Sequence, residues 1–141
     1  MEYLTVEDLL TIAAELIDSP AVRDIGLLDA AAHRPRASAF GKDAYATIHE
    51  KAAALLEAIA RNRALVDGNN RLAWAAALVF YDLNGFELEA SSVDDAVELV
   101  VTVATGSLEL TKLAERLATW TSLRAAPSRS ITDPPSAVPG P

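Results

Sequence analysis

Apolar residues recur at spacings of three and four along most of this chain, which is the period of an amphipathic helix and not of a strand. The longest such segment runs from Asp43 to about Arg63 and has a continuous apolar stripe on one face. The stripe consists of Ile48, Ala52, Leu55, Leu56 and Ile59. Arg63 follows Ile59 by one helical turn, so we expect it to extend the buried stripe.

Further segments carry helical patterns and complete the prediction of an all-α fold, a compact bundle of about six helices. They cover residues 5–17, 25–34, 71–84, 92–104 and 107–120. The segment 71–84 is apolar almost all round, which predicts a helix at the centre of the bundle. Thr5 and Ser92 each precede an apolar run, as N-cap residues do. No convincing sheet is predicted, and only residues 86–90 suggest a short extended link.

The composition changes after Leu123. Five of the seven prolines lie in residues 127–141, together with Ser and Gly and without an aromatic residue. Such a segment cannot bury enough apolar surface to offset the entropy lost on ordering. We therefore predict one domain at residues 1–123 and a flexible proline-rich tail at 124–141.

The charge and the missing cysteines exclude several classes of function. A net charge of −8 means that phosphate backbones repel the chain, which disfavours direct nucleic-acid binding. The absence of cysteine excludes disulfides and thiolate metal sites, and it suits a reducing cytoplasm. No signal peptide is readable and no apolar run is long enough to span a bilayer, so we expect a cytoplasmic protein without a membrane partner. His33 and His49 lack the spacing of a zinc site.

The residues that join two predicted helices, Arg63 to Arg71, contain the groups of an anion-binding pocket. A helix start presents unpaired backbone N–H groups and the positive end of a dipole. Gly68 lets the backbone approach a ligand, and Asn69 and Arg71 add hydrogen-bond donors. Asp67 supplies a hard oxygen ligand of the kind that Mg²⁺ needs beside phosphates. The same residues are also typical of an ordinary turn with Asp or Asn capping the next helix, and their spacing alone does not decide between the two.

This segment resembles the motif of the Fic/Doc superfamily, His-x-Phe-x-(Asp/Glu)-(Gly/Ala)-Asn-(Gly/Lys)-Arg. The residues that match it position for position are Asp67, Gly68, Asn69 and Arg71. The flanking segments resemble the Doc (death-on-curing) branch, and the similarity runs from residue 3 to about residue 120. The similar flanks are Tyr3-Leu4-Thr5, Arg23-Asp24-Ile25-Gly26-Leu27-Leu28, Arg34-Pro35-Arg36-Ala37, His49-Glu50-Lys51-Ala52-Ala53 and Asn84-Gly85.

The resemblance implies a helical bundle whose motif loop binds ATP and Mg²⁺, with Asp67 on the metal. The phosphate ligands that it implies are Gly68, Asn69, Asn70 and Arg71. Doc toxins transfer the terminal phosphate of ATP to a threonine of elongation factor Tu and halt translation, and a small Phd-like antitoxin blocks them with a helical segment. Most other Fic proteins transfer AMP to a hydroxyl. By the same resemblance, residues 23–42 border the flap that docks the target protein.

Three positions depart from the family pattern. Arg63 stands where the family has the histidine that takes the proton from the attacking hydroxyl, and arginine has no lone pair with which to act as a base. Asn70 stands where Doc proteins have Lys and Fic proteins have Gly, which removes a cation and should weaken phosphate binding. Leu65 stands where the family often has Phe. The resemblance thus implies a toxin of a type II toxin–antitoxin module that is catalytically impaired in this form.

Several alternatives remain open. Arg63 can simply complement the negative end of its own helix. The transferred group can be AMP, or the chain can be a non-catalytic module that keeps a groove and binds the antitoxin. A stand-alone helical scaffold is a third alternative, which leaves the match to the motif unexplained. The sequence does not decide whether Arg63 and Asn70 are natural or introduced.

Overall fold

The computed structural model describes residues 1–124, and the fold is all-α as predicted, with six α-helices and only short strands in this range. The helices are α1 (Val6–Leu16), α2 (Ile25–His33), α3 (Ile48–Asn62), α4 (Asn69–Leu83), α5 (Val93–Ala104) and α6 (Leu110–Thr119). The short elements are η1 (Arg34–Arg36), β1 (Ser38–Ala39), β2 (Lys42–Asp43), β3 (Phe86–Leu88) and β4 (Thr121–Leu123). Except for Arg124, the predicted tail at 124–141 lies outside the described residues.

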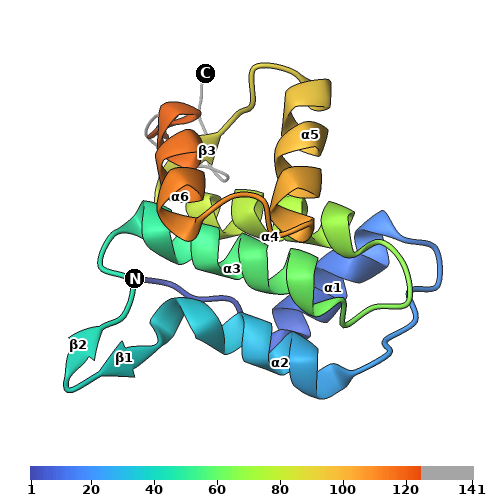
Figure 1. Ribbon diagram of the computed structural model, residues 1–141. Helices are drawn as coiled ribbons and strands as arrows, with labels where there is room; N and C mark the ends of the chain where they lie inside the picture. The colour runs from blue at the N-terminus through green and yellow to red at the C-terminus, as the bar shows by residue number, and fades with distance from the viewer. Residues whose placement is uncertain (125–141) are drawn as a thin grey trace, which may run out of the picture.

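Helices α3 and α4 form the middle of the bundle (Figure 1). Helices α5 and α6 stand on one side of this pair, α2 lies on the other, and α1 packs against α4 and α2. The predicted central position of the helix at 71–84 is confirmed, because one side of α4 is fully buried. The buried residues of α4 are Asn69, Leu72, Ala73, Ala76, Ala77, Phe80 and Tyr81. No helix within residues 1–124 is both long and apolar enough to cross a membrane.

Side-chain caps set the starts of four helices, among them α2, where the Asp24 carboxylate accepts a hydrogen bond from the Leu27 amide. The Thr5 hydroxyl accepts a hydrogen bond from the Asp8 amide while the Asp8 carboxylate accepts one from the Thr5 amide, and this reciprocal pair begins α1. Thr47 and Glu50 form the same capping box at α3. Ser92 caps α5. The predicted caps at Thr5 and Ser92 are confirmed.

Two small antiparallel ladders are present that the sequence pattern did not predict. Strand β1 pairs with β2, and β3 pairs with β4 near the end of the described chain. The prediction that the long helix begins at Asp43 is wrong, because Asp43 belongs to β2 and the chain turns into α3 only after Thr47. Strands of two or three residues are too short to show an alternating pattern in the sequence.

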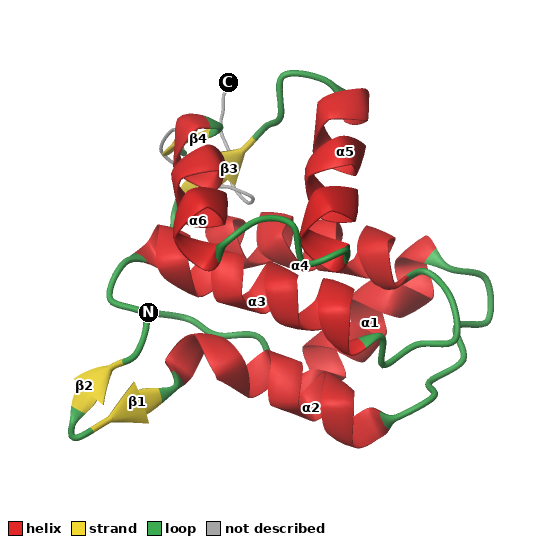
Figure 2. Ribbon diagram, in the orientation of Figure 1, coloured by secondary structure: helices red, strands yellow, loops and turns green. Residues whose placement is uncertain are grey.

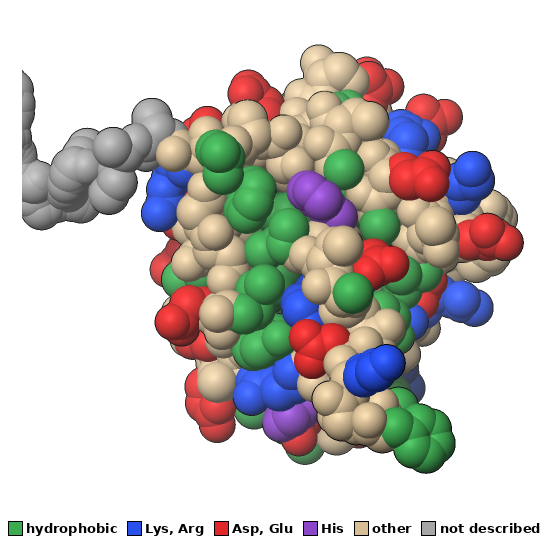
Figure 3. Space-filling view, turned by 90° about the vertical axis from the view of Figure 1, so that its left-hand side faces the viewer, with side chains coloured by type: hydrophobic (Ala, Val, Ile, Leu, Met, Phe, Trp, Pro, Cys, Tyr) green, Lys and Arg blue, Asp and Glu red, His purple; other side chains and the backbone are tan. Residues whose placement is uncertain are grey.

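The β1–β2 hairpin carries an exposed aromatic residue at its tip. Phe40 and Gly41 join the two strands with φ values of 54° and 78°, and two-residue hairpin turns of this kind need positive φ at both positions. Phe40 is fully exposed. The hairpin stands away from the helical body, beside the N-terminus (Figure 2). Figure 3 looks onto this end of the molecule, where hydrophobic side chains lie among Lys, Arg, Asp and Glu side chains.

Candidate functional site

Arg63 lies at the junction between α3 and the motif loop, but it does not extend the buried stripe. Helix α3 ends at Asn62, and Arg63 is its C-cap in the left-handed conformation, with φ 53° and ψ 52°. Its side chain is exposed. The prediction of an inward-facing Arg63 is therefore wrong, because a left-handed residue leaves the 3.6-residue period that aligned it with Ile59.

The buried side chain of Asn69 bridges the motif loop by two hydrogen bonds to the backbone of Leu65. Its side chain accepts a hydrogen bond from the backbone N–H of Leu65 and donates one to the Leu65 carbonyl, both at 2.9 Å. Asn69 is 2% exposed and Leu65 is also buried, so these two bonds satisfy backbone groups that water does not reach. The loop is thereby held in one shape between α3 and α4.

Gly68 is the N-cap of α4 and has a φ of 87°. An added Cβ would lie 2.3 Å from Cδ1 of Ile17, so the Ile17 side chain would have to shift to admit one. Asp67, the preceding residue, is exposed, and its Oδ1 accepts a hydrogen bond of 2.9 Å from the Gly68 amide. The turn with Asp or Asn capping the next helix is not what forms, because Gly68 occupies the cap position and the structure assigns no side-chain cap to α4. The backbone N–H groups at the start of α4 are therefore not capped by a side chain and can bind an anion.

Arg71 and Asn70 lie in the first turn of α4 and face a cavity. The exposed Arg71 guanidinium donates to the Leu16 carbonyl at the end of α1. The Oδ1 atom of Asn70 is buried and has no hydrogen-bond partner among the residues described. Both side chains border a cavity of about 440 Å³ between α1, α4 and α5. Its other lining residues are Leu16, Trp74, Ala75, Leu78, Val93, Ala96, Val97, Val100 and Val101.

These placements bring the predicted ligands to one end of α4. Asp67 precedes the start of α4 and Arg71 lies in its first turn, and both residues are exposed. Arg63 is exposed at the other end of the loop. No group of three or more His, Asp or Glu side chains within residues 1–124 could hold a metal ion by itself. Asp67 alone still fits Mg²⁺, since this ion is commonly held by one or two carboxylates together with substrate phosphates and water.

A segment ahead of α2 clamps the motif loop. The backbone amides of Arg23 and Asp24 both donate to the Ala64 carbonyl, at 2.7 and 3.0 Å, and the Val66 amide donates to Ala21 at 2.9 Å. The Arg23 guanidinium donates to the carbonyls of Asn62, the last residue of α3, and of Arg63, its C-cap. The sequence marked Arg23 only as part of a similar flank, because nothing local indicates a contact with a residue 40 positions away.

Replacing Arg23 by Met should lower the free energy of unfolding by about 1 kcal/mol, because charged hydrogen bonds to the α3 carbonyls are lost at an exposed position. Urea denaturation would measure the loss. Arg23→Lys should lose less, since lysine keeps the charge but not the forked donors. Equal stability of all three proteins would show that the clamp rests on the backbone bonds alone.

His49 lies away from this loop. It occupies the first turn of α3, so the length of that helix, about 20 Å, separates it from Arg63. Its Nδ1 is 2.8 Å from the hydroxyl of the buried Tyr81. Burial raises the pKa of Tyr81, so the hydroxyl stays protonated and donates, and His49 accepts as a neutral imidazole. A packing role for His49, and not a catalytic one, fits this contact.

Acidification should weaken the fold through His49. Burial lowers the pKa of His49, so the unfolded chain takes up this proton more readily than the folded one. The contribution is complete above the ordinary histidine pKa of 6.5 and is lost as the pH falls below it. In urea denaturation, the His49→Gln variant should lose less stability between pH 7.5 and pH 5 than the wild type. His33→Gln, at the surface, is the control; the same pH response in both variants would contradict the assignment.

The chain is similar to a known protein family and to a named protein of that kind. A family model described as Fic/DOC family matches residues 3–81, which include α1 to α3, the motif loop and most of α4. A protein of Mycolicibacterium smegmatis (strain ATCC 700084 / mc(2)155) with the name Toxin Doc is 50% identical over 119 residues. These residues make up 83% of this chain and 92% of that protein.

Proposed function

Since this chain belongs to the Fic/DOC family, we propose that it is a Doc-type toxin of a type II toxin–antitoxin module, built to phosphorylate elongation factor Tu with ATP and impaired in its chemical step. Proteins of this family generally transfer phosphate or AMP to other proteins. The observation that carries the proposal is the state of the motif loop. Its helix start keeps the donors for phosphates, whereas position 63 presents an arginine.

The binding half of the site is assigned to four residues that follow Asp67. The N–H groups of the first turn of α4, which begins after Gly68, would bind phosphate oxygens together with the side chains of Asn70 and Arg71. Arg71 has five N–H donors, so its bond to Leu16 leaves others for a ligand. Asn69 contributes by holding the loop shut. Asp67 would hold Mg²⁺, which neutralises phosphate charge when bound.

The chemical half of the site lacks a proton acceptor at position 63. The threonine hydroxyl of the target must lose its proton as it attacks, and a positioned base contributes roughly 10²–10⁴ to such a rate. The guanidinium of Arg63 is always protonated and only donates. It can hold a phosphate oxygen, so nucleotide binding survives in this proposal while transfer is slow.

The proposal is tested by restoring the family residues. The variant Arg63→His/Asn70→Lys is incubated with elongation factor Tu and ATP labelled at either the γ- or the α-phosphate. Label from the γ-phosphate on a threonine of the factor supports the kinase. Label from the α-phosphate would mean AMP transfer, the alternative activity. No label from either nucleotide, with the variant folded, would overturn the enzymatic proposal.

An antitoxin-binding module is the second candidate, and the cavity beside the motif loop favours it. Val93, Val97 and Val101 recur every fourth residue along α5, are exposed, and line this cavity with apolar surface. An apolar groove of this kind fits the apolar face of an amphipathic helix. Asn70 and Arg71 line the α4 side of the same cavity, so a Phd-like antitoxin helix seated here would cover the phosphate site. Loss of antitoxin co-purification in a Val97→Asp variant would support this candidate, and unchanged co-purification would exclude the groove.

A further inference from the structure

Two short extended segments pair beside the motif. Val22, ahead of α2, forms an isolated antiparallel bridge with Leu65 in the motif loop. Backbone hydrogen bonds of 2.9 and 2.7 Å join the residues on either side of this pair. Val22 and Leu65 are therefore a non-hydrogen-bonded pair, in which the N–H and C=O groups of each residue point away from the other residue. The bridge thus has two outer edges, one at Leu65 and one at Val22.

One of these edges is closed and the other is open. The Asn69 side chain donates to the Leu65 carbonyl and accepts from the Leu65 amide, as a neighbouring strand would. At Val22, neither the N–H nor the C=O group has a hydrogen-bond partner within residues 1–124. Val22 is 39% exposed, so both groups can be reached from outside. An open backbone edge is a template for one more strand.

The open edge lies beside the positions to which the proposed chemistry is assigned. Arg63 and Asp67 each stand two residues from Leu65, the bridge partner of Val22. Neighbouring strands lie about 5 Å apart, so a strand added at Val22 would run about 10 Å from Leu65. Such a strand would pass along the motif loop at the reach of a side chain and a bound phosphate.

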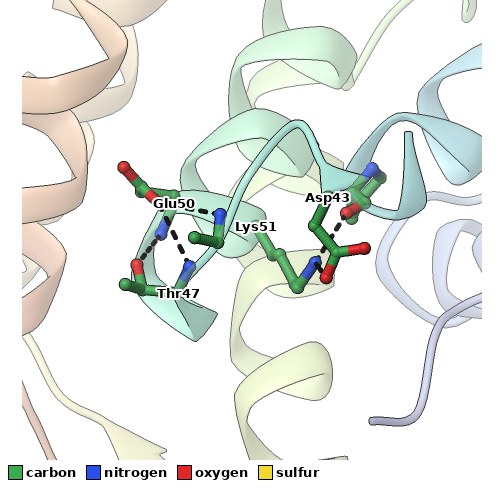
Figure 4. Close-up of polar contacts among 6 residues, drawn as sticks. Asp43, Thr47, Glu50 and Lys51 are labelled. Carbon is green, nitrogen blue, oxygen red and sulfur yellow. Dashed lines mark hydrogen bonds and ion pairs between the residues drawn. The ribbon is translucent and has the colours of Figure 1, made fainter. Parts of the chain in front are cut away.

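The β1–β2 hairpin offers no comparable edge beside this loop. It joins the start of α3, where the ammonium of Lys51 donates to Asp43, the last residue of β2, at 3.2 Å (Figure 4). The motif loop follows the other end of α3, and this helix is about 20 Å long. Only the edge at Val22 is bonded directly to the motif loop.

The open edge is held in place and has an apolar border. Arg23, the next residue, donates from its guanidinium to the carbonyls of Asn62 and Arg63, so the segment is fixed to the end of α3. In strand addition, main-chain hydrogen bonds supply affinity, and side chains along the edge receive alternate residues of the added strand. The exposed apolar side chains along this edge are Val22, Ile25 and Val66.

We propose that the backbone of Val22 binds an extended segment of the protein substrate as an added strand and so positions its hydroxyl at the motif loop. This inference rests on the proposed function for the identity of the substrate, elongation factor Tu. The segment that carries the hydroxyl has to cross residues 63–67, and Val22 is paired with the middle of that range. A helix could not bind in this way, because its backbone groups are bonded to one another.

Amide hydrogen exchange tests the added strand in the unmodified chain. In the free protein the Val22 amide should exchange fast and the Val66 amide slowly, because only the second is hydrogen-bonded. Saturating elongation factor Tu should slow exchange at Val22 by about tenfold or more and leave Val66 slow. A complex in which exchange at Val22 stays fast would overturn the proposal. A slow Val22 amide without the factor would also overturn it, because another part of this chain or a second copy would then occupy the edge.

Kinetics test the same contact in the restored Arg63→His/Asn70→Lys background. Val22→Pro removes the N–H donor, and the fixed φ of proline suits an extended edge. The KM for the factor should rise by about tenfold, with kcat and the KM for ATP unchanged. Val22→Thr is the matched control and should lose much less, because it keeps both backbone groups and a branched side chain. An equal rise in both variants would assign the contact to the valine side chain and overturn the backbone role.

The outcomes separate this inference from the proposed function. Slower exchange at Val22 with the factor, in a protein whose restored form labels nothing, would support the edge and overturn the proposed function. Label on the factor with no effect at Val22 in either test would overturn the edge and leave the proposed function standing. If Val22→Pro also speeds exchange at Val66, the loop itself has opened, and the exchange test in the unmodified chain decides.

Discussion

A single Arg63→His substitution is expected to raise the rate of transfer to the protein substrate by roughly 10²–10⁴. The new imidazole would supply the lone pair that arginine lacks. The backbone at this position already accepts a side chain at φ 53°, and histidine is one of the residues enriched in the left-handed region. The Arg23 clamp holds the carbonyl of residue 63, so the substitution leaves the loop in place.

The measurement is a comparison of four proteins: wild type, Arg63→His, Asn70→Lys and the double variant. Arg63→His should raise kcat with little change in the affinity for ATP, and Asn70→Lys should act mainly on that affinity by adding a cation at the helix start. Arg63→Ala is the control, because it removes the arginine without adding a base. A rise in rate for Arg63→Ala equal to that for Arg63→His would mean that arginine blocks the site, and the missing base would no longer explain the proposed impairment.

Gly68→Ala is expected to lower the free energy of unfolding by about 2–5 kcal/mol. About 1–2 kcal/mol comes from placing a Cβ at positive φ, and about 1–3 kcal/mol comes from overpacking. The new Cβ would lie 2.3 Å from Cδ1 of Ile17, closer than any real contact, so the Ile17 side chain must move away. Nucleotide binding should weaken as well, because Gly68 is the N-cap of α4, next to the proposed phosphate site.

Gly85→Ala is the matched control for this substitution. Gly85 has the same φ of 87°, but a Cβ there would meet nothing within 4 Å, so only the cost of about 1–2 kcal/mol for the backbone applies. The excess loss in Gly68→Ala therefore measures the contact with Ile17. Removing the obstacle in Gly68→Ala/Ile17→Ala should recover part of it, relative to Ile17→Ala alone. Equal losses at Gly68 and Gly85 would show that the contact relaxes freely.

The sequence by itself determined the fold class, the helices and the family. These depend on local signals: apolar residues three and four apart share a helix face, and Thr5 and Ser92 bond to amides three residues on. The motif Asp67 to Arg71 is likewise contiguous, so its residues had to lie close together wherever the helices packed. The arginine at position 63, on which the proposed loss of a base rests, is also readable without a structure.

The tertiary structure alone decided how these residues are used. Arg63 turns out of the helix into a left-handed cap, and the guanidinium of Arg71 reaches a carbonyl 55 residues earlier in the chain. Lys51 stands three residues after Ile48 and four before Leu55, in the period of the apolar stripe. Its ammonium nevertheless donates to Asp43 and to the Pro35 carbonyl, next to a hairpin that was not predicted. Such contacts join segments that are distant along the chain, and the packing of whole helices brings them together. Local periodicity carries no record of that packing.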